Sequence, residues 1–271
     1  MEFCGTQLAG FGASREVLEE IVRTWEISNE LFDVIKKPGS FPRFAHFEAN
    51  ENLHIGFRWS STPGCYLIFF GSTAATQDGA LQFRAVLSHQ NILTPTWNAD
   101  VMKIGEDILG QPQLSPLRLV VMLLNQCERH LENSIQQHAK RVETAQGYLP
   151  YPEVNAPARH TEGLLPSELY EMYRELTTSI FTLRNSCRNL MEICSGLMSD
   201  SKTALSSRYR TSMDHGCNTM TALSLLQRGI ERIHARLKFQ LNRIHYLDNI
   251  HIQATKSMAA LKQLMLLNKS H

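Results

Sequence analysis

Residues 220–267 read MTALSLLQRGIERIHARLKFQLNRIHYLDNIHIQATKSMAALKQLMLL, a stretch without proline. Its apolar or tolerated residues recur at alternating steps of four and three: Leu226, Ile230, Ile233, Leu237, Gln240, Ile244, Leu247, His251, Ala254, Met258, Leu261 and Met265. The heptad pattern predicts one long helix with a narrow apolar seam. At 1.5 Å per residue this helix is roughly 70 Å long, so we expect it to project or to pair along its length.

A second heptad seam lies between Ser167 and the polar segment 199–201. Its members again step by four and three: Leu169, Tyr173, Leu176, Ile180, Leu183, Cys187, Leu190, Cys194 and Leu197. A further helix is predicted from about Thr203, with a break at Gly216 before the terminal helix. Two successive seams favour an antiparallel helical hairpin, coiled-coil-like, which packs further against copies of itself.

Eight apolar residues of the terminal seam form the candidate site, for helix packing or oligomer formation: Leu226, Ile230, Ile233, Leu237, Ile244, Leu247, Met258 and Leu261. Gln240 and His251 also occupy seam positions. A polar residue in a seam commonly sets helix register or oligomer state, with some loss of stability. The alternative interpretation is that neither polar side chain is fully buried.

The first half of the chain has a different character, with aromatic and turn residues in place of heptads. Strands are predicted at 54–59, 65–70 and 81–88, after a helix that Ser14 caps. Ser115-Pro116 begins another helix, which runs to about residue 145. The predicted fold class is α+β, mainly α. The predicted domains are a flexible lead-in at 1–13, a small mixed α/β module at 14–147, a proline-rich linker at 148–166 and a long helical hairpin or stalk at 167–271.

Composition limits the classes of function. The net charge of +1 gives no sign of a basic nucleic-acid surface. The six cysteines form no CxxC pair, and the N-terminus lacks the pattern of a secretory signal, so we expect a reducing, cytoplasmic location. Cys187 and Cys194 fit small buried hydrophobes on the helix seam. No run of about 18 apolar residues occurs, so no membrane span is predicted.

Catalytic motifs are missing from the sequence. It contains no HExxH metal motif and no GxSxG nucleophile elbow, and Gly10-Phe11-Gly12 lacks the rest of a phosphate loop. We therefore expect a protein that is not an enzyme.

Arg228, Arg232 and Arg236 recur every four residues beside the seam. They form either a solvated charged face or a site for an acidic partner or anionic lipid headgroups.

One phrase of the terminal helix suggests a family. The run from Arg236 to Asn249 contains RLKFQL, and with the helix that continues to Leu267 it resembles the stalk of fungal CorA-like divalent-cation transporters. The strand around Phe57-Arg58-Trp59, the apolar strand after it and the long helix before the linker are similar to the cytoplasmic domains of that family. The two transmembrane helices and the Gly-Met-Asn pore signature of the family are not found in these residues.

The resemblance implies a non-catalytic cytoplasmic and stalk domain of a magnesium transporter. It would act by oligomerisation and by sensing Mg²⁺, which the family does through acidic residues between subunits. No position here matches those ligands, so the metal site is unknown. The partners expected are copies of the chain or another helix, with membrane proximity only as part of a transporter. The alternative function is a helical protein–protein interaction scaffold unrelated to transport.

Overall fold

The computed structural model describes residues 44–49, 52–62, 65–75, 81–90, 115–147, 166–200 and 218–269, with the single positions 20, 23 and 24. The predicted lead-in, most of the helix predicted after Ser14, nearly all of the linker and the predicted break at Gly216 lie outside these residues.

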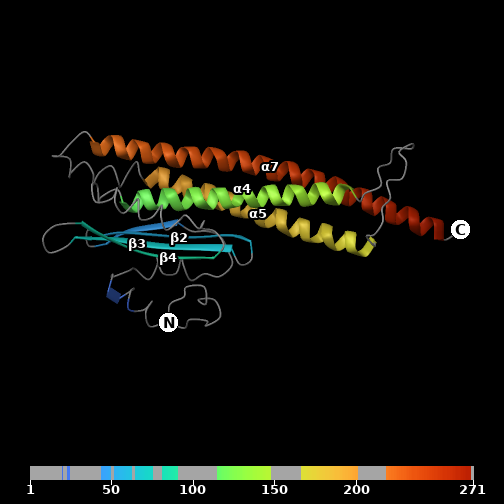
Figure 1. Ribbon diagram of the computed structural model, residues 1–271, viewed down its shortest axis with the longest axis horizontal. Coiled ribbons are helices and arrows are strands. Elements are labelled where there is room, and N and C mark those ends of the chain that lie inside the picture. The colour runs from blue at the N-terminus through green and yellow to red at the C-terminus, as the bar shows by residue number, and fades with distance from the viewer. Residues whose placement is uncertain are drawn as a thin grey trace.

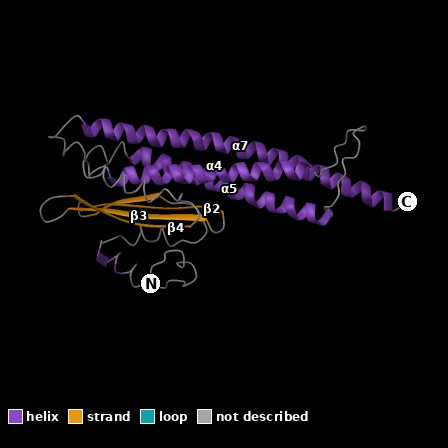
Figure 2. Cartoon of the chain, viewed as in Figure 1, coloured by secondary structure: helices purple, strands orange, loops and turns teal. Residues whose placement is uncertain are grey.

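Three long helices dominate the described part of the chain (Figures 1 and 2). They are α4 at Ser115–Gly147, α5 at Pro166–Asp200 and α7 at Asn218–Lys269. The capping serine before proline explains the start of α4, and a proline at the first position suits the start of α5. Helix α7 continues through Gly229 without interruption over 52 residues. The prediction of one long terminal helix is confirmed, as is the mainly helical character.

Helices α5 and α7 pack antiparallel, as the predicted hairpin requires, and α4 joins them in a three-helix bundle (Figure 1). Arg141 of α4 pairs with Glu175 of α5, and Cys187 of α5 contacts the backbone of Leu237 in α7. Helices α4 and α7 each run antiparallel to α5, and Figure 1 shows all three side by side. The sequence pattern predicts α4 as part of the first module, but α4 packs against both α5 and α7. A third helix is needed because two seams facing each other leave the flanks of each apolar stripe in water.

Four strands form an antiparallel sheet in the order β1-β2-β3-β4. Their bounds are Phe44–Ala49, Asn52–Thr62, Cys65–Ala75 and Leu81–Gln90. Arg58 pairs with Ile68, and the register shifts between Ser60 and Thr62. Strand β1 was not predicted. The described ranges do not show a separate mixed α/β module, since all strand pairs are antiparallel and α4 lies in the bundle.

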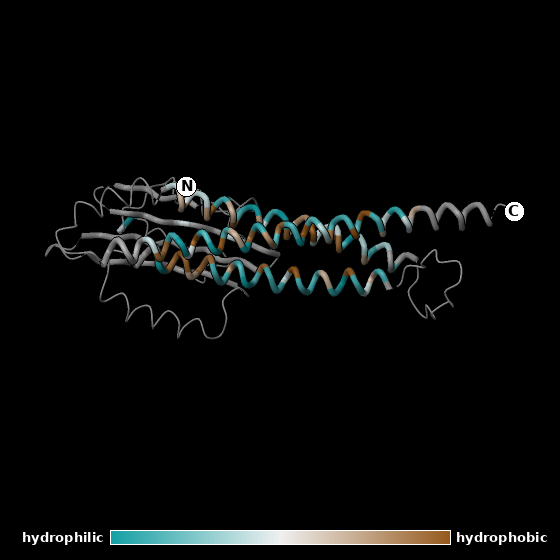
Figure 3. Tube along the Cα trace, turned by 90° about the horizontal axis from the view of Figure 1, so that it is seen from above, coloured by the Kyte–Doolittle hydropathy of each residue, from teal (hydrophilic) through white to brown (hydrophobic). Residues whose placement is uncertain are grey.

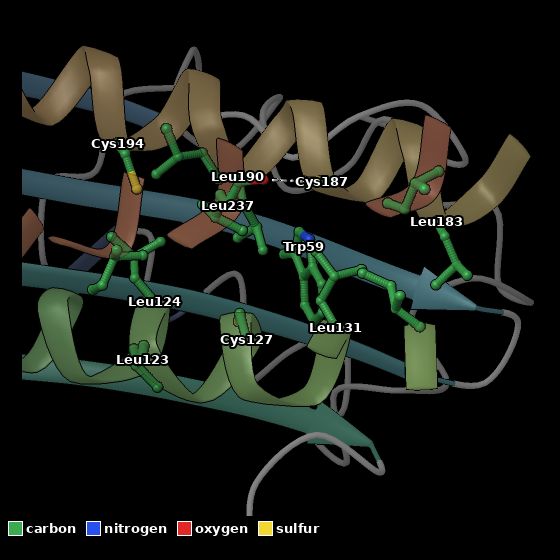
Figure 4. Close-up of a cluster of buried hydrophobic side chains, with 14 of the residues drawn as sticks. Trp59, Leu123, Leu124, Cys127, Leu131, Leu183, Cys187, Leu190, Cys194 and Leu237 are labelled. Carbon is green, nitrogen blue, oxygen red and sulfur yellow. Dashed lines mark hydrogen bonds between the residues drawn. The ribbon is translucent and has the colours of Figure 1, made fainter. Parts of the chain in front are cut away.

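Trp59 of β2 connects the sheet to the bundle. Its side chain is fully buried, and its Nε1 donates a hydrogen bond to the backbone oxygen of Ser186 in α5 at 3.2 Å. The ring of His130 from α4 meets the Trp59 ring edge-on, with centroids 6.0 Å apart. Figure 4 shows Trp59 among Leu131, Leu190 and other apolar side chains. One large aromatic residue thus ties β2, α4 and α5 together, because it buries a large apolar area and satisfies its single donor.

The core of the bundle follows the seams predicted from the sequence. In Figure 3 apolar and polar segments alternate along each helix, as the heptad periodicity requires. The larger cluster of buried side chains contains Trp59 and residues of α4, α5 and α7. A smaller cluster lies further along the bundle and consists of Val142, Ala145, Tyr173, Leu176 and Ala254. Figure 1 shows the sheet beside only one end of the helices.

Candidate functional site

The predicted seam of α7 lies inside the molecule. Ile230, Ile233, Leu237, Ile244 and Leu247 are buried in the larger core cluster, together with side chains of α4 and α5. Leu226 is half-buried against the same cluster. Met258 and Leu261 belong to α7, but their side chains lie outside the described residues. The buried part of the seam is therefore covered by helices of its own chain and offers no free surface to a second copy.

The two polar seam residues are also buried, with 3% of Gln240 and 4% of His251 exposed. The interpretation that neither is fully buried is wrong. Arg243 Nη1 donates a hydrogen bond to Gln240 Oε1 at 3.0 Å, which satisfies the amide from within the same helix. His251 Nε2 lies 2.5 Å from Thr177 Oγ1 of α5. His251 thus fixes α7 against α5 through a polar contact between helices.

An ion pair that the sequence does not reveal joins α4 to α7, between the exposed Arg236 and the buried carboxylate of Glu128. Arg236 Nε donates to Glu128 Oε2 at 3.0 Å, and Arg236 Nη2 donates to Asn125 Oδ1 at 2.6 Å. Burial raises the pKa of Glu128, while Arg236 acts in the opposite direction. Arg236 therefore does not belong to a free basic stripe with Arg228 and Arg232. The only signal in the sequence was a glutamate on the apolar side of α4, next to Cys127.

The described cysteines are buried thiols without the environment of a nucleophile. Cys127, Cys187 and Cys194 are reduced and buried in the larger cluster, so the prediction of small buried hydrophobes is confirmed for the last two. Desolvation raises the pKa of Cys187 and of Cys194 to about 12. Cys187 Sγ donates to the backbone oxygen of Leu237 at 3.2 Å. A thiol must ionise to attack or to bind a metal, and these thiols resist ionisation.

The side of α7 that faces away from the bundle carries exposed apolar and basic residues. Leu225, Phe239 and Tyr246 occur at multiples of seven residues, and 61% of Phe239 and 67% of Tyr246 are exposed. Arg232 and Lys238 lie on the same side and make no ion pair with the described residues. We call these five residues the outer face of α7. In Figure 1 this helix lies on the side of the bundle away from the sheet.

The described ranges contain no group of three His, Cys, Asp or Glu side chains that could hold a metal ion. None of the helices in these ranges is both long and apolar enough to cross a bilayer. The described residues instead form a closed apolar core, an ion pair between the exposed Arg236 and the buried Glu128, and an exposed face of α7.

The chain has low structural similarity to two solved proteins. No protein-family profile and no curated protein matches the chain. Two similar solved structures are the ZntB cytoplasmic domain from Vibrio parahaemolyticus and the full-length CmaX protein. The first has a TM-score of 0.44 and 12% identity, and the match covers 88% of this chain and 83% of that one. The second has a TM-score of 0.46 and 15% identity, covering 93% and 68%. Likenesses at this level carry no weight in assigning a function.

Proposed function

We propose that this chain is the cytoplasmic and stalk part of a CorA-like divalent-cation transporter, of the fungal type that its sequence resembles. In this proposal the antiparallel sheet and the three-helix bundle make up one α+β unit, and the chain acts in the cytoplasm without catalysis. The observation that supports it is α7, an unbroken helix of 52 residues that follows shorter helices of 33 and 35 residues. Figure 1 shows its C-terminal end extending beyond α4 and α5, as a stalk does.

Self-association in this proposal uses the outer face of α7. The seam from Ile230 to Leu247 is already covered within the chain, so this part is not available to a second copy. Phe239 and Tyr246 lie seven residues apart and are largely exposed. Side chains at this spacing on one side of a helix can form a second, shorter seam against another helix. Exposed aromatic residues of this size are common anchors of protein interfaces.

The test is the mass of the chain in solution, measured by light scattering over a range of protein concentrations, with and without millimolar Mg²⁺. The proposal expects an oligomer whose mass or midpoint of assembly changes with Mg²⁺. The double variant Phe239→Asp with Tyr246→Asp should be a folded monomer. The matched control replaces the exposed α5 residues Tyr170 and Phe181 by aspartate and should still assemble. A wild-type chain that remains monomeric with and without Mg²⁺ contradicts the proposal.

A second candidate function is a scaffold that binds an acidic helix of another protein. The observation that favours it is the charge of the outer face, because Arg232 and Lys238 have no anionic partner among the described residues. Two copies of one basic face repel each other, whereas an acidic helix gains from the same charges. A labelled acidic amphipathic peptide should bind a monomeric wild type and release at high salt. The double variant Arg232→Glu with Lys238→Glu should not bind it.

A further inference from the structure

A layer of buried polar side chains crosses the bundle where the two core clusters meet. It consists of His138 from α4, Tyr173 from α5 and His251 from α7, and we call it the histidine layer. The exposed fractions of His138 and Tyr173 are 3% and 2%. Both ring nitrogens of His138, the hydroxyl of Tyr173 and Nδ1 of His251 are buried without a hydrogen-bond partner among the described residues. Such groups are uncommon in cores because each lacks the hydrogen bonds that it makes in water.

Thr177 determines which nitrogen of His251 carries the proton. The Thr177 hydroxyl donates its single hydrogen to the backbone oxygen of Tyr173 at 2.9 Å. With this hydrogen on the Tyr173 oxygen, the contact of 2.5 Å between the Thr177 oxygen and His251 Nε2 is made by an N–H group on Nε2. Nδ1 of the neutral ring is left with its lone pair facing the buried side. Protonation of His251 would place a new N–H donor, and a charge, where the described residues provide no hydrogen-bond acceptor.

The charged groups around the layer give little support to a protonated imidazole. Arg141 of α4 is a cation next to His138, and its partner is Glu175 of α5 at 2.9 Å. Asp248 of α7 favours protonation of His251, but Asp248 is itself paired with Arg184 of α5.

The pKa values of the two histidines follow from this setting. Burial, with help from Arg141 and His251, lowers the pKa of His138 to about 4. Burial also lowers the pKa of His251, against the opposite effect of Asp248. The two rings oppose each other's charge, so protonation of one makes protonation of the other harder.

The histidine layer lies between the larger and the smaller cluster of buried side chains. On the side of the layer where the sheet lies, nineteen buried side chains of the described residues form the larger cluster around Trp59. On the other side, the smaller cluster of described residues has five buried members, of which one is Tyr173 of the layer itself and two are alanines. Figure 1 shows no described strand beside that end of the helices. Fewer of the described apolar side chains are buried there, so we expect the distal end to separate at a lower free energy than the rest.

We propose that the histidine layer is a proton-operated switch, which opens the distal end of the bundle on acidification while the core around Trp59 stays packed. The open form exposes both imidazoles to water, where they take up protons at their ordinary pKa. The closed form holds them neutral. Acid therefore favours the open form by mass action.

The sign and size of the effect follow from the pKa of His138. The open form binds more protons between about pH 6.5 and about pH 4, so the opening equilibrium constant rises as the pH falls through that window. His138 contributes about tenfold per pH unit and up to about 300-fold in total. His251 adds to the rise in the same direction, because its pKa in the closed form is also lowered.

Hydrogen exchange followed by mass spectrometry on the full chain tests the switch, at a series of pH values down to about pH 4. Amides in 166–177 and 248–257 report the distal end, and amides in 183–197 report the larger cluster. We expect the distal amides to lose protection, relative to the others, by about tenfold per pH unit after correction for intrinsic exchange. The variants His138→Leu and His138→Gln should each flatten this dependence, since neither new side chain takes up a proton.

The control is His245→Leu, on an exposed position of the same helix as His251, which should keep the wild-type dependence. Wild-type amides that lose protection together along the whole bundle overturn the proposal, because the opening would then be global. An unchanged pH dependence in a folded His138→Gln chain overturns it as well. Should His138→Leu fail to fold, His138→Gln and the wild-type profile still decide between these results.

Discussion

Two acidic substitutions in the seam of α7 test whether the seam is closed within one chain. The variant is Ile233→Asp with Leu237→Asp, at positions with almost no exposed surface. Each change removes about 2–3 kcal/mol of apolar burial and places a carboxylate among the apolar side chains of α4 and α5. Burial of an unpaired charge adds several kcal/mol per site, so the sum approaches the whole stability of a domain, about 5–15 kcal/mol.

The assay is urea unfolding followed by far-ultraviolet circular dichroism, at a low and a high protein concentration. Loss of most helical signal in the variant, without urea and at both concentrations, is the expected result. The control variant, Phe239→Asp with Tyr246→Asp, changes exposed positions of the same helix and should keep the wild-type helical signal. A seam variant that is fully helical but monomeric, beside an oligomeric wild type, would refute the reasoning, because the seam would then join separate chains.

Two further substitutions probe contacts between α4 and α7. Arg236→Ala leaves the buried carboxylate of Glu128 without its partner, and we expect urea unfolding to show a loss of stability of about 3 kcal/mol. The control Arg232→Ala, at an exposed position one turn earlier, should have little effect. A small loss for Arg236→Ala would mean that water reaches Glu128. Gly229→Ala should raise the midpoint of thermal unfolding, because alanine has about 1 kcal/mol more helix propensity than glycine. The new Cβ would lie 3.4 Å from Val121 Cγ1, which is an ordinary contact distance. A lower midpoint would show that the helices pack too closely at this position to accept a methyl group.

Local periodicity determined the helical part of this protein. The heptad steps in 220–267 predicted a single helix, and the structure places it at Asn218–Lys269. The serine–proline start at residue 115 likewise predicted α4 within two residues at either end. These features depend on neighbours three and four residues apart, so they can be read along the chain without knowledge of the fold.

Only the tertiary structure decided what each apolar face meets. The seam of α7 does not show whether its partner is α4, α5 or another molecule. The hydrophobic effect is non-directional, so any apolar surface of the right shape can cover the seam. The spacing of Arg236 from Arg232 and Arg228 is typical of a solvated charged face. In the structure, however, Arg236 donates a hydrogen bond to Glu128, which is 108 residues away in the sequence. His138 and His251 join one buried layer only because α4 and α7 run parallel beside α5. Contacts of this kind arise from how the helices pack together, and so they are absent from any local pattern of the sequence.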